Sequence, residues 1–229
     1  MTLRHLKASW RRFTRRSAAP ACLLVWCGMV SMAQAQAPSN PNLNAQLLVG
    51  ARQGDIAQVE RTLAQGAAPN SRNRLGKTAL LLAAEKGQLP LANRMLDAGA
   101  DVNLASLEGV TPLMAACYAG NDALARRLLA AGARTEPLDR MRKPAMVYAA
   151  GQGHARAIEA LLDAGVDVNA AYENQLTALM WAAGQGHAEA VQRLLQRGAR
   201  ADMRDNRALS ALDMARQGGH EGVVALLSP

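Results

Sequence analysis

Cysteines and aromatic residues are scarce in this chain of 229 residues, which contains three cysteines and only 3% Phe, Trp and Tyr. Beyond residue 35 the only cysteine is Cys117, so an intramolecular disulfide is excluded there. The same part of the chain holds few aromatic rings on which nucleic-acid bases could stack. It also shows no clustered metal ligands and no Ser-His-Asp arrangement with supporting context. These absences argue against a metalloenzyme, a hydrolase or a cofactor-dependent enzyme.

An excess of acidic or basic charge is also missing once the first 35 residues are set aside. The whole chain has 26 basic and 18 acidic residues, a net charge of +8 and an isoelectric point near 10.1. Six of the basic residues and none of the acidic ones lie within residues 1–35. The remainder therefore has 20 basic against 18 acidic residues, which is too balanced for a nucleic-acid binder. We expect no nucleic-acid partner.

The first 35 residues have the layout of a secretory signal peptide. Basic residues are followed by an apolar stretch over 21–33 and by the small-x-small site Ala33-Gln34-Ala35, which predicts cleavage after Ala35. The apolar stretch is shorter than the roughly 20 residues that span a bilayer, so we expect no stable membrane anchor after cleavage. A retained signal anchor is the alternative.

The short basic leader and the Ala-x-Ala site are typical of bacteria and predict export to the periplasm, with secretion from the cell as the alternative. Trp26 before Cys27 is too bulky for a lipoprotein signal. The pairs Arg11-Arg12 and Arg15-Arg16 leave twin-arginine export open beside the Sec route.

Beyond the leader, three series of residues recur every 33 positions without an insertion. The first series is Gly66, Gly99, Gly132, Gly165 and Gly198; the second is Gly54, Gly87, Gly120, Gly153, Gly186 and Gly219; the third is Thr78, Thr111, Pro144, Thr177 and Ser210. A fixed period of this length indicates a stacked-repeat architecture. Such a fold presents an extended surface and does not by default enclose a catalytic cleft.

One copy, residues 71–103, shows how the repeat folds. Thr78 is suited to cap the N-terminus of a helix, because its hydroxyl accepts from an unpaired N–H of the first turn. Gly87 and Gly99 lie where the chain leaves a helix, and glycine adopts a positive φ without strain. A second helix is expected over about 90–98, so each unit is predicted to be a helix-turn-helix.

The repeat resembles the ankyrin repeat. Thr111-Pro112-Leu113-Met114 is similar to the opening of that consensus, and 99–103 and 165–169 are similar to its closing loop. The resemblance implies an all-α repeat solenoid of stacked helix-turn-helix units with β-turn or hairpin loops. It covers residues from near 40 to the C-terminus. Pro144 replaces the capping threonine, so that helix should be the least well capped, whereas Ser210 and Asp213 form a capping-box variant.

We therefore divide the chain into a signal peptide (1–35), a linker (36–41) and an ankyrin-repeat domain (42–229). The expected units are 42–70, 71–103, 104–136, 137–169, 170–202 and 203–229. The terminal units are expected to close the core with a more polar outer face.

The resemblance also implies that partners bind at the loop tips and at the exposed ends of the first helices. The predicted binding residues are Arg74, Leu75, Lys77, Leu107, Glu108, Val110, Tyr118, Arg140, Met141, Lys143, Glu173 and Leu176. Tyr118 is the expected aromatic anchor. The apolar tip residues are expected to form a semi-continuous strip, the alternative being that some fold back and only pack. Arg140, Arg142 and Lys143 form a basic patch that is either a solvated face or a contact for an acidic partner.

Other conspicuous residues are interpreted as structural. His154, His187 and His220 recur at the repeat spacing, too far apart to share a metal ion, so no metal site is predicted. Tyr148 and Trp181 occupy the position of Leu82 and are expected to pack in the core, as are Cys117 and Leu129.

The sequence thus predicts a non-enzymatic, monomeric adaptor without a cofactor, which binds a partner protein through the concave face and loop tips of its repeats. A secreted host-directed effector, or an accessory or inhibitor factor of a periplasmic enzyme, is the alternative.

Overall fold

The computed structural model of the protein describes residues 40–228. The predicted signal peptide, with its cleavage site after Ala35, lies outside the described residues. In the described part the chain forms six pairs of helices and no strand. The first helices of the pairs are α1 (Pro41–Gln53), α3 (Ala79–Glu85), α5 (Pro112–Tyr118), α7 (Ala145–Gly151), α9 (Ala178–Gly184) and α11 (Ala211–Gln217). The second helices are α2 (Ile56–Ala64), α4 (Leu89–Asp97), α6 (Asp122–Ala130), α8 (Ala155–Asp163), α10 (Ala188–Gln196) and α12 (Glu221–Leu227).

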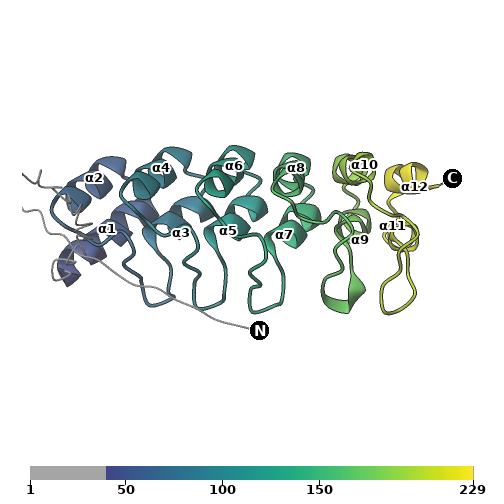
Figure 1. Cartoon of the computed structure of the whole chain (residues 1–229), viewed down its shortest axis with the longest axis horizontal. Coiled ribbons are helices and arrows are strands. Elements are labelled where there is room, and N and C mark those ends of the chain that lie inside the picture. Colours follow the sequence, from purple (N-terminus) through teal and green to yellow (C-terminus); the bar gives the residue numbers. More distant parts are fainter. Residues whose placement is uncertain (1–39, 229) are drawn as a thin grey trace, which may run out of the picture. The chain divides into compact units, whose positions relative to one another are not determined.

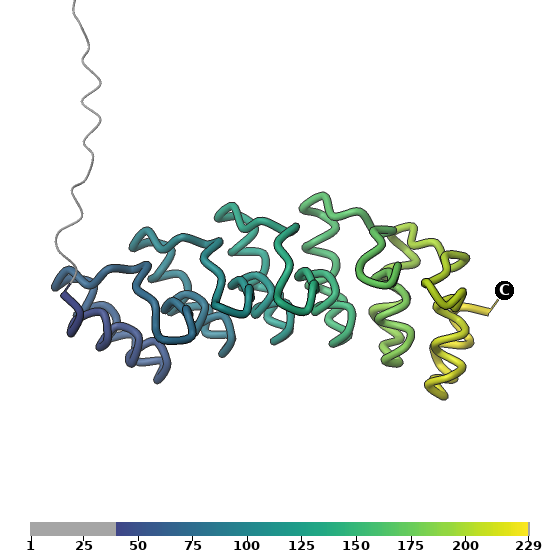
Figure 2. Tube along the Cα trace, turned by 90° about the horizontal axis from the view of Figure 1, so that it is seen from below, coloured from purple at the N-terminus to yellow at the C-terminus, as the bar shows by residue number. Residues whose placement is uncertain are grey.

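The helices form two layers, as the predicted all-α solenoid requires. The first helices make one row and the second helices the other, and the loops that precede the first helices project from the stack (Figure 1). Each helix of a row packs against its neighbours in the same row and against its own partner (Figure 2). Helix α1 begins at Pro41, with Asn40 as its N-cap, one residue before the expected boundary. None of the helices found between residues 40 and 228 is both long and apolar enough to cross a membrane.

The first helices begin where the sequence predicted. Thr78, Thr111 and Thr177 each accept a hydrogen bond from the backbone N–H three residues on, at 3.2, 3.2 and 3.3 Å. Ser210 and Asp213 form the predicted capping box, and the N–H and hydroxyl of Ser210 lower the pKa of the Asp213 carboxyl. Pro144 provides no side-chain cap to α7, which confirms that prediction.

Small residues allow the first helices to pack closely. Paired residues such as Ala83 and Ala84, and Ala149 and Ala150, are completely buried. Cys117 occupies the same position in α5, and burial raises the pKa of its thiol to about 12. It is a small packing residue and not a reactive thiol, as predicted.

In the second helices, the first member of the apolar pair is always the more deeply buried in the second to fifth units. Leu128 of α6 is fully buried, whereas Leu129, predicted from the sequence to be core, is only partly buried. Met95, Leu161 and Leu194 occupy the position of Leu128 in the neighbouring repeats and are also fully buried. The sequence-based assignment of Leu129 to the core was therefore wrong by one residue, because both leucines satisfy the helical periodicity.

The repeated histidines join successive repeats. The Nε2 atoms of His154, His187 and His220 lie 3.0–3.1 Å from backbone carbonyls at the end of the preceding first helix, namely those of Tyr118, Gly151 and Gly184. A protonated Nε2 thus donates to carbonyls that have no partner within their own helix. This contact accounts for the 33-residue spacing of the histidines without a metal ion.

A second inter-repeat contact is interrupted once. The side-chain oxygens of Asn70, Asn103 and Asn169 accept from the backbone N–H 31 residues further on, at 2.8–2.9 Å. Glu136 occupies this position at the end of the third unit, and within residues 40–228 the pair Glu136–Asp167 makes no such bond. The junction between the third and fourth units therefore lacks one of the contacts that join the others.

The loop tips are interrupted at the next junction, between the fourth and fifth units. Backbone bonds join neighbouring tips from Leu107 to Leu75, from Arg140 to Glu108 and from Asn206 to Asn174, but none joins Met141 to Glu173 in the described chain. Most tips are organised by a side chain that accepts from the N–H four residues on, as Asp139 does from Lys143. Tyr172 occupies that position in the fifth unit. Its hydroxyl is buried without a protein partner, and burial raises its pKa to about 12.

We expect Glu136→Asn to stabilise the protein by about 0.5–1.5 kcal/mol, the usual net value of one hydrogen bond. The new amide oxygen would accept from the N–H of Asp167, as Asn103 does from Arg134. Urea unfolding followed by circular dichroism would measure this. Glu136→Gln is the matched control, because it removes the same negative charge but its amide is one methylene further out. Equal stabilities of the two variants would contradict the prediction.

Candidate interaction groove

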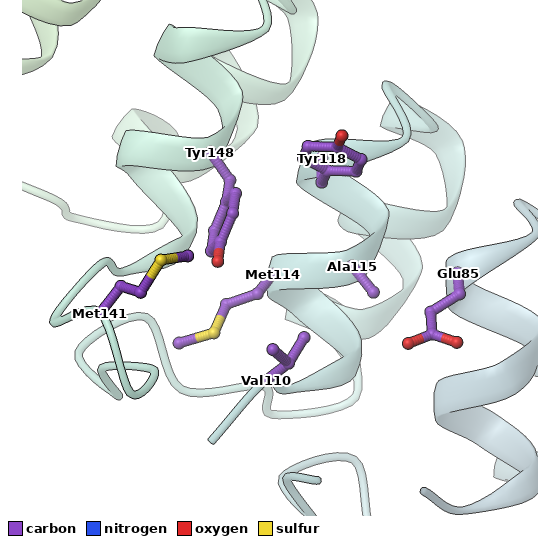
Figure 3. Close-up of a pocket in the computed structure, with 7 residues that line it drawn as sticks. All are labelled: Glu85, Val110, Met114, Ala115, Tyr118, Met141 and Tyr148. Carbon is purple, nitrogen blue, oxygen red and sulfur yellow. The ribbon is translucent and has the colours of Figure 1, made fainter. Parts of the chain in front are cut away.

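An apolar recess lies on the side of the stack that carries the first helices and the loop tips. It has a volume of about 440 Å³. Its lining residues are Glu85, Val110, Met114, Ala115, Tyr118, Met141 and Tyr148. Figure 3 shows Met114, Ala115 and Tyr118 on one helix, with Tyr148 and Met141 on one side of it and Glu85 on the other. The recess therefore spans three successive repeats.

A second recess of about 290 Å³ continues the first toward the C-terminus. Tyr118, Met141 and Tyr148 line both recesses, and Lys143 and Trp181 belong to the second. We call the two recesses together the central groove. The groove is continuous because the same three side chains form the end of one recess and the beginning of the next.

The repeat register explains how a hollow forms among large side chains. Position 115 and its equivalents hold Leu82, Ala115, Tyr148 and Trp181, while the positions three residues later hold Glu85, Tyr118, Gly151 and Gly184. Residues three apart are neighbours on a helix surface, so each ring in the groove lies beside an alanine or a glycine. A Cβ atom at Gly151 would lie 3.8 Å from Cε3 of Trp181. These small residues leave the faces of the rings accessible.

The central ring of the groove is fixed by a buried carboxylate. The hydroxyl of Tyr148 donates to Asp139, which is only 7% exposed and also accepts from the backbone N–H of Lys143 at 2.7 Å. Burial, together with the bond to Asp139, raises the pKa of Tyr148 well above its ordinary value. Tyr118 packs edge-on against Tyr148, with the ring centroids 5.9 Å apart. The groove is thus preorganised around Tyr148.

Charged side chains surround the groove. Lys77 pairs with Glu85 at 2.7 Å, and Arg140 pairs with Glu108 at 3.2 Å. The ammonium nitrogen of Lys143 lies 4.9 Å from the ring centroid of Trp181, within cation–π distance.

The structure places the predicted binding residues in different surroundings. Val110, Tyr118, Met141 and Lys143 line the central groove, with Tyr118 56% and Met141 59% exposed. Arg74 lines a separate recess beside α1. Lys77 and Arg140 are in ion pairs with Glu85 and Glu108. Glu173 is exposed at the fifth tip, outside the groove.

The predicted apolar strip along the tips is not continuous. Leu75 and Leu107 are 60% and 71% exposed but line neither recess of the groove. Leu176 is partly buried against the core, as expected if some tip residues fold back and only pack. The positive φ values of Asn174 and Gln175 mark a changed tip at this repeat.

Three large side chains of the groove were not predicted as binding residues. Tyr148 and Trp181 were expected to pack in the core; they do contact it, but each also lines the groove. Met114, named in the sequence only as part of the motif that opens the repeat, lies in the wall of the recess. Pairing the two series three residues apart in the sequence would have found Tyr148 and Trp181, because it places large residues next to small ones on one helix face.

This arrangement offers a surface for contact with another molecule. The histidines are used in joining repeats, and among residues 40–228 no group of three or more His, Cys, Asp or Glu is placed to hold a metal ion. The groove combines apolar and aromatic side chains with cations at its rim. Such a composition is typical of a protein interface.

Comparison with protein families agrees with the geometry. The family model described as ankyrin repeats (3 copies) matches residues 47–139 and 146–229. The two matches cover more than half of the chain and leave out only the end of the fourth loop tip between them. A search of the curated proteins finds no match to the chain.

Proposed function

The chain belongs to the ankyrin-repeat family, whose repeats are protein–protein interaction modules, and on this premise we propose that it is a non-enzymatic adaptor that binds a partner protein through the central groove. The observation that carries the proposal is the exposure of Tyr118 and Met141 in an apolar recess beside the fixed ring of Tyr148. Exposed aromatic residues next to a preformed hollow are favoured anchors of interfaces.

The stacked repeats support tight binding by their rigidity. Each tip that lines the groove is held by hydrogen bonds to its neighbour, from Leu107 to Leu75 and from Arg140 to Glu108. A surface that is already ordered loses little conformational entropy when a partner binds.

We place this activity in the periplasm. The basic leader, its short apolar stretch and the Ala33-Gln34-Ala35 site support export. Fractionation of the source cell, with an antibody against the protein, would test the location, and recovery from the medium would favour a secreted effector instead.

An affinity pull-down tests the binding function. The full chain and the variant Tyr118→Ala/Met141→Ala are used as baits with periplasmic extract of the source cell. A protein retained by the full chain and lost with the variant would support the groove as the binding surface. A protein retained equally by both baits would move the interface elsewhere. If the captured protein is an enzyme whose activity changes on binding, the accessory or inhibitor role would be favoured.

We predict that Tyr118→Ala weakens binding of the partner by about 1–2 kcal/mol, as is usual for an interface aromatic. Its melting temperature should change by no more than a few degrees, because the ring is 56% exposed. Calorimetric titration and thermal unfolding would measure the two effects. Leu107→Ala is the control, since Leu107 is exposed but lies outside the groove; a loss of affinity as large as that of Tyr118→Ala would contradict the prediction.

A further inference from the structure

We propose that the partner presents an acidic, extended segment to the central groove, with one bulky apolar side chain inserted between Tyr118, Met141 and Tyr148 and with carboxylates facing Arg142 and Lys143. This inference rests on the proposed binding function and adds the chemical class of the partner. The proposal has three grounds. The groove has an apolar lining, the cations beside it are unpaired within residues 40–228 whereas arginines of the second helices form ion pairs, and other possible ligands match the groove less well.

The apolar anchor follows from the lining of the first recess. Apart from Glu85, its side chains are aliphatic, thioether or aromatic. The Tyr148 hydroxyl is engaged by Asp139, and the Glu85 carboxylate by Lys77. A polar group inserted here would thus lose water without finding a free partner, which disfavours it. A large apolar side chain fills the recess without that cost.

The extended form follows from the dimensions of the groove. Residues of the second, third and fourth units line the first recess, and Trp181 of the fifth unit lines the second. An occupant that fills both recesses therefore has to run along the stack across these units.

The acidic character follows from the cations of the fourth tip. Lys143 lines the second recess, and Arg142, which lies between the groove residues Met141 and Lys143, is exposed. In the part of the chain that the structure describes neither forms an ion pair. The acidic groups nearest the groove are already engaged: Glu85 by Lys77, Glu108 by Arg140 and Asp139 by Tyr148. The rim of the groove thus offers free positive charge and no free carboxylate.

The opposite side of the stack uses its charges differently. Arginines of the second helices join neighbouring repeats: Arg94 pairs with Glu60, Arg127 with Asp97 and Arg197 with Asp163. There the arginines hold the stack together, so a partner would have to compete with existing pairs. Unpaired cations beside an apolar hollow match an acidic segment that carries an apolar side chain. Opposite charges speed the association of the two molecules, and the cations repel basic partners.

Two other occupants fit less well. The first 35 residues of the chain itself contain basic residues and no acidic ones, so the rim would repel them. A nucleic acid is bound mainly through its phosphates, by a run of cations. Here the free cations belong to one tip, the fourth, and lie beside an apolar recess.

Selection from a display library of random twelve-residue peptides tests the inference. The full chain is the bait, and peptides that also bind the variant Tyr118→Ala/Met141→Ala are removed. We expect the remaining peptides to share Phe, Trp, Leu or Met flanked by Asp and Glu. Groove-dependent peptides of neutral or basic composition would overturn the inference but leave the binding function standing. Recovery of no groove-dependent peptide would overturn both.

A pair of charge-reversal variants tests the role of the rim. With the tightest selected peptide, Arg142→Glu/Lys143→Glu should lower the affinity at least about tenfold at low salt. Arg134→Glu/Arg156→Glu makes the same change of charge away from the groove, at exposed residues, and should leave the affinity within about twofold. Equal losses in the two variants would overturn the assignment to the rim. Equal binding of a single-stranded oligonucleotide, also lost in Arg142→Glu/Lys143→Glu, would favour nucleic acid and overturn the proposal.

Discussion

Leu128→Ala is expected to lower the free energy of unfolding by about 2–5 kcal/mol, the usual cost of truncating a leucine in a close-packed core. Leu128 is fully buried in α6, which packs against α5 and against α4 and α8 of the neighbouring repeats. The cavity would weaken the interfaces with both neighbours. In a stacked fold, stability is approximately the sum of the units and their interfaces, so one truncation affects two junctions.

Urea unfolding followed by circular dichroism would measure this loss. Leu129→Ala is the matched control: it makes the same chemical change at the adjacent residue, which is only partly buried, and should cost less than half as much. A larger loss for Leu129→Ala than for Leu128→Ala would mean that the helix is turned by one position relative to the structure.

Asp139→Ala is expected to destabilise the protein by about 1–3 kcal/mol, because it leaves two partly buried donors without their acceptor. These donors are the backbone N–H of Lys143 and the hydroxyl of Tyr148. The bond from Lys143 organises the fourth tip, which contributes Met141 to the groove, so binding of the partner should weaken as well. Thermal unfolding and calorimetric titration would record the two losses.

The variant Asp139→Asn removes the negative charge of the side chain but keeps an oxygen that can accept the same hydrogen bonds. Asn73, in the same position of the second unit, accepts from the N–H of Lys77 at 3.0 Å, so an asparagine can organise the tip. We expect Asp139→Asn to retain most of the stability. The pKa of Tyr148 should fall toward its ordinary value while remaining raised, because burial is the larger cause of its shift and persists. An ultraviolet titration of tyrosine would show this; an unchanged pKa would mean that Asp139 does not influence the hydroxyl.

The two junctions of the fourth unit are the places where the repeats depart from their pattern. Between the third and fourth units, Glu136 replaces the asparagine that elsewhere bonds to the next unit. Between the fourth and fifth units, Tyr172 replaces the residue that organises the tip, and the Met141–Glu173 backbone bond is missing in the described residues. On the helical side of this second junction His187 still contacts the carbonyl of Gly151, and Arg193 still pairs with Glu159. The interruption there is therefore confined to the loop side, next to the second recess of the groove.

The sequence by itself determined the architecture of this protein. Residues that fix a helix end act through bonds within a few positions of the chain, so the caps Thr78 and Ser210 and the missing cap at Pro144 could be predicted. The 33-residue period then specified how identical units stack, because each unit buries its apolar face only against its neighbours. The structural interpretation of His154, His187 and His220 also rested on this 33-residue spacing.

Only the tertiary structure decided which side chains, and which parts of them, remain accessible to a partner. Leu128 and Leu129 both fit the helical period, and their burial differs only because the neighbouring helices lie closer to one of them. Tyr148 and Trp181 contact the core and also line the groove, since Gly151 leaves space beside them. The free charge of Arg142 likewise depends on which acids lie within reach across repeats. Periodicity places residues on a helix, but the packing of one repeat on the next determines the surface that remains.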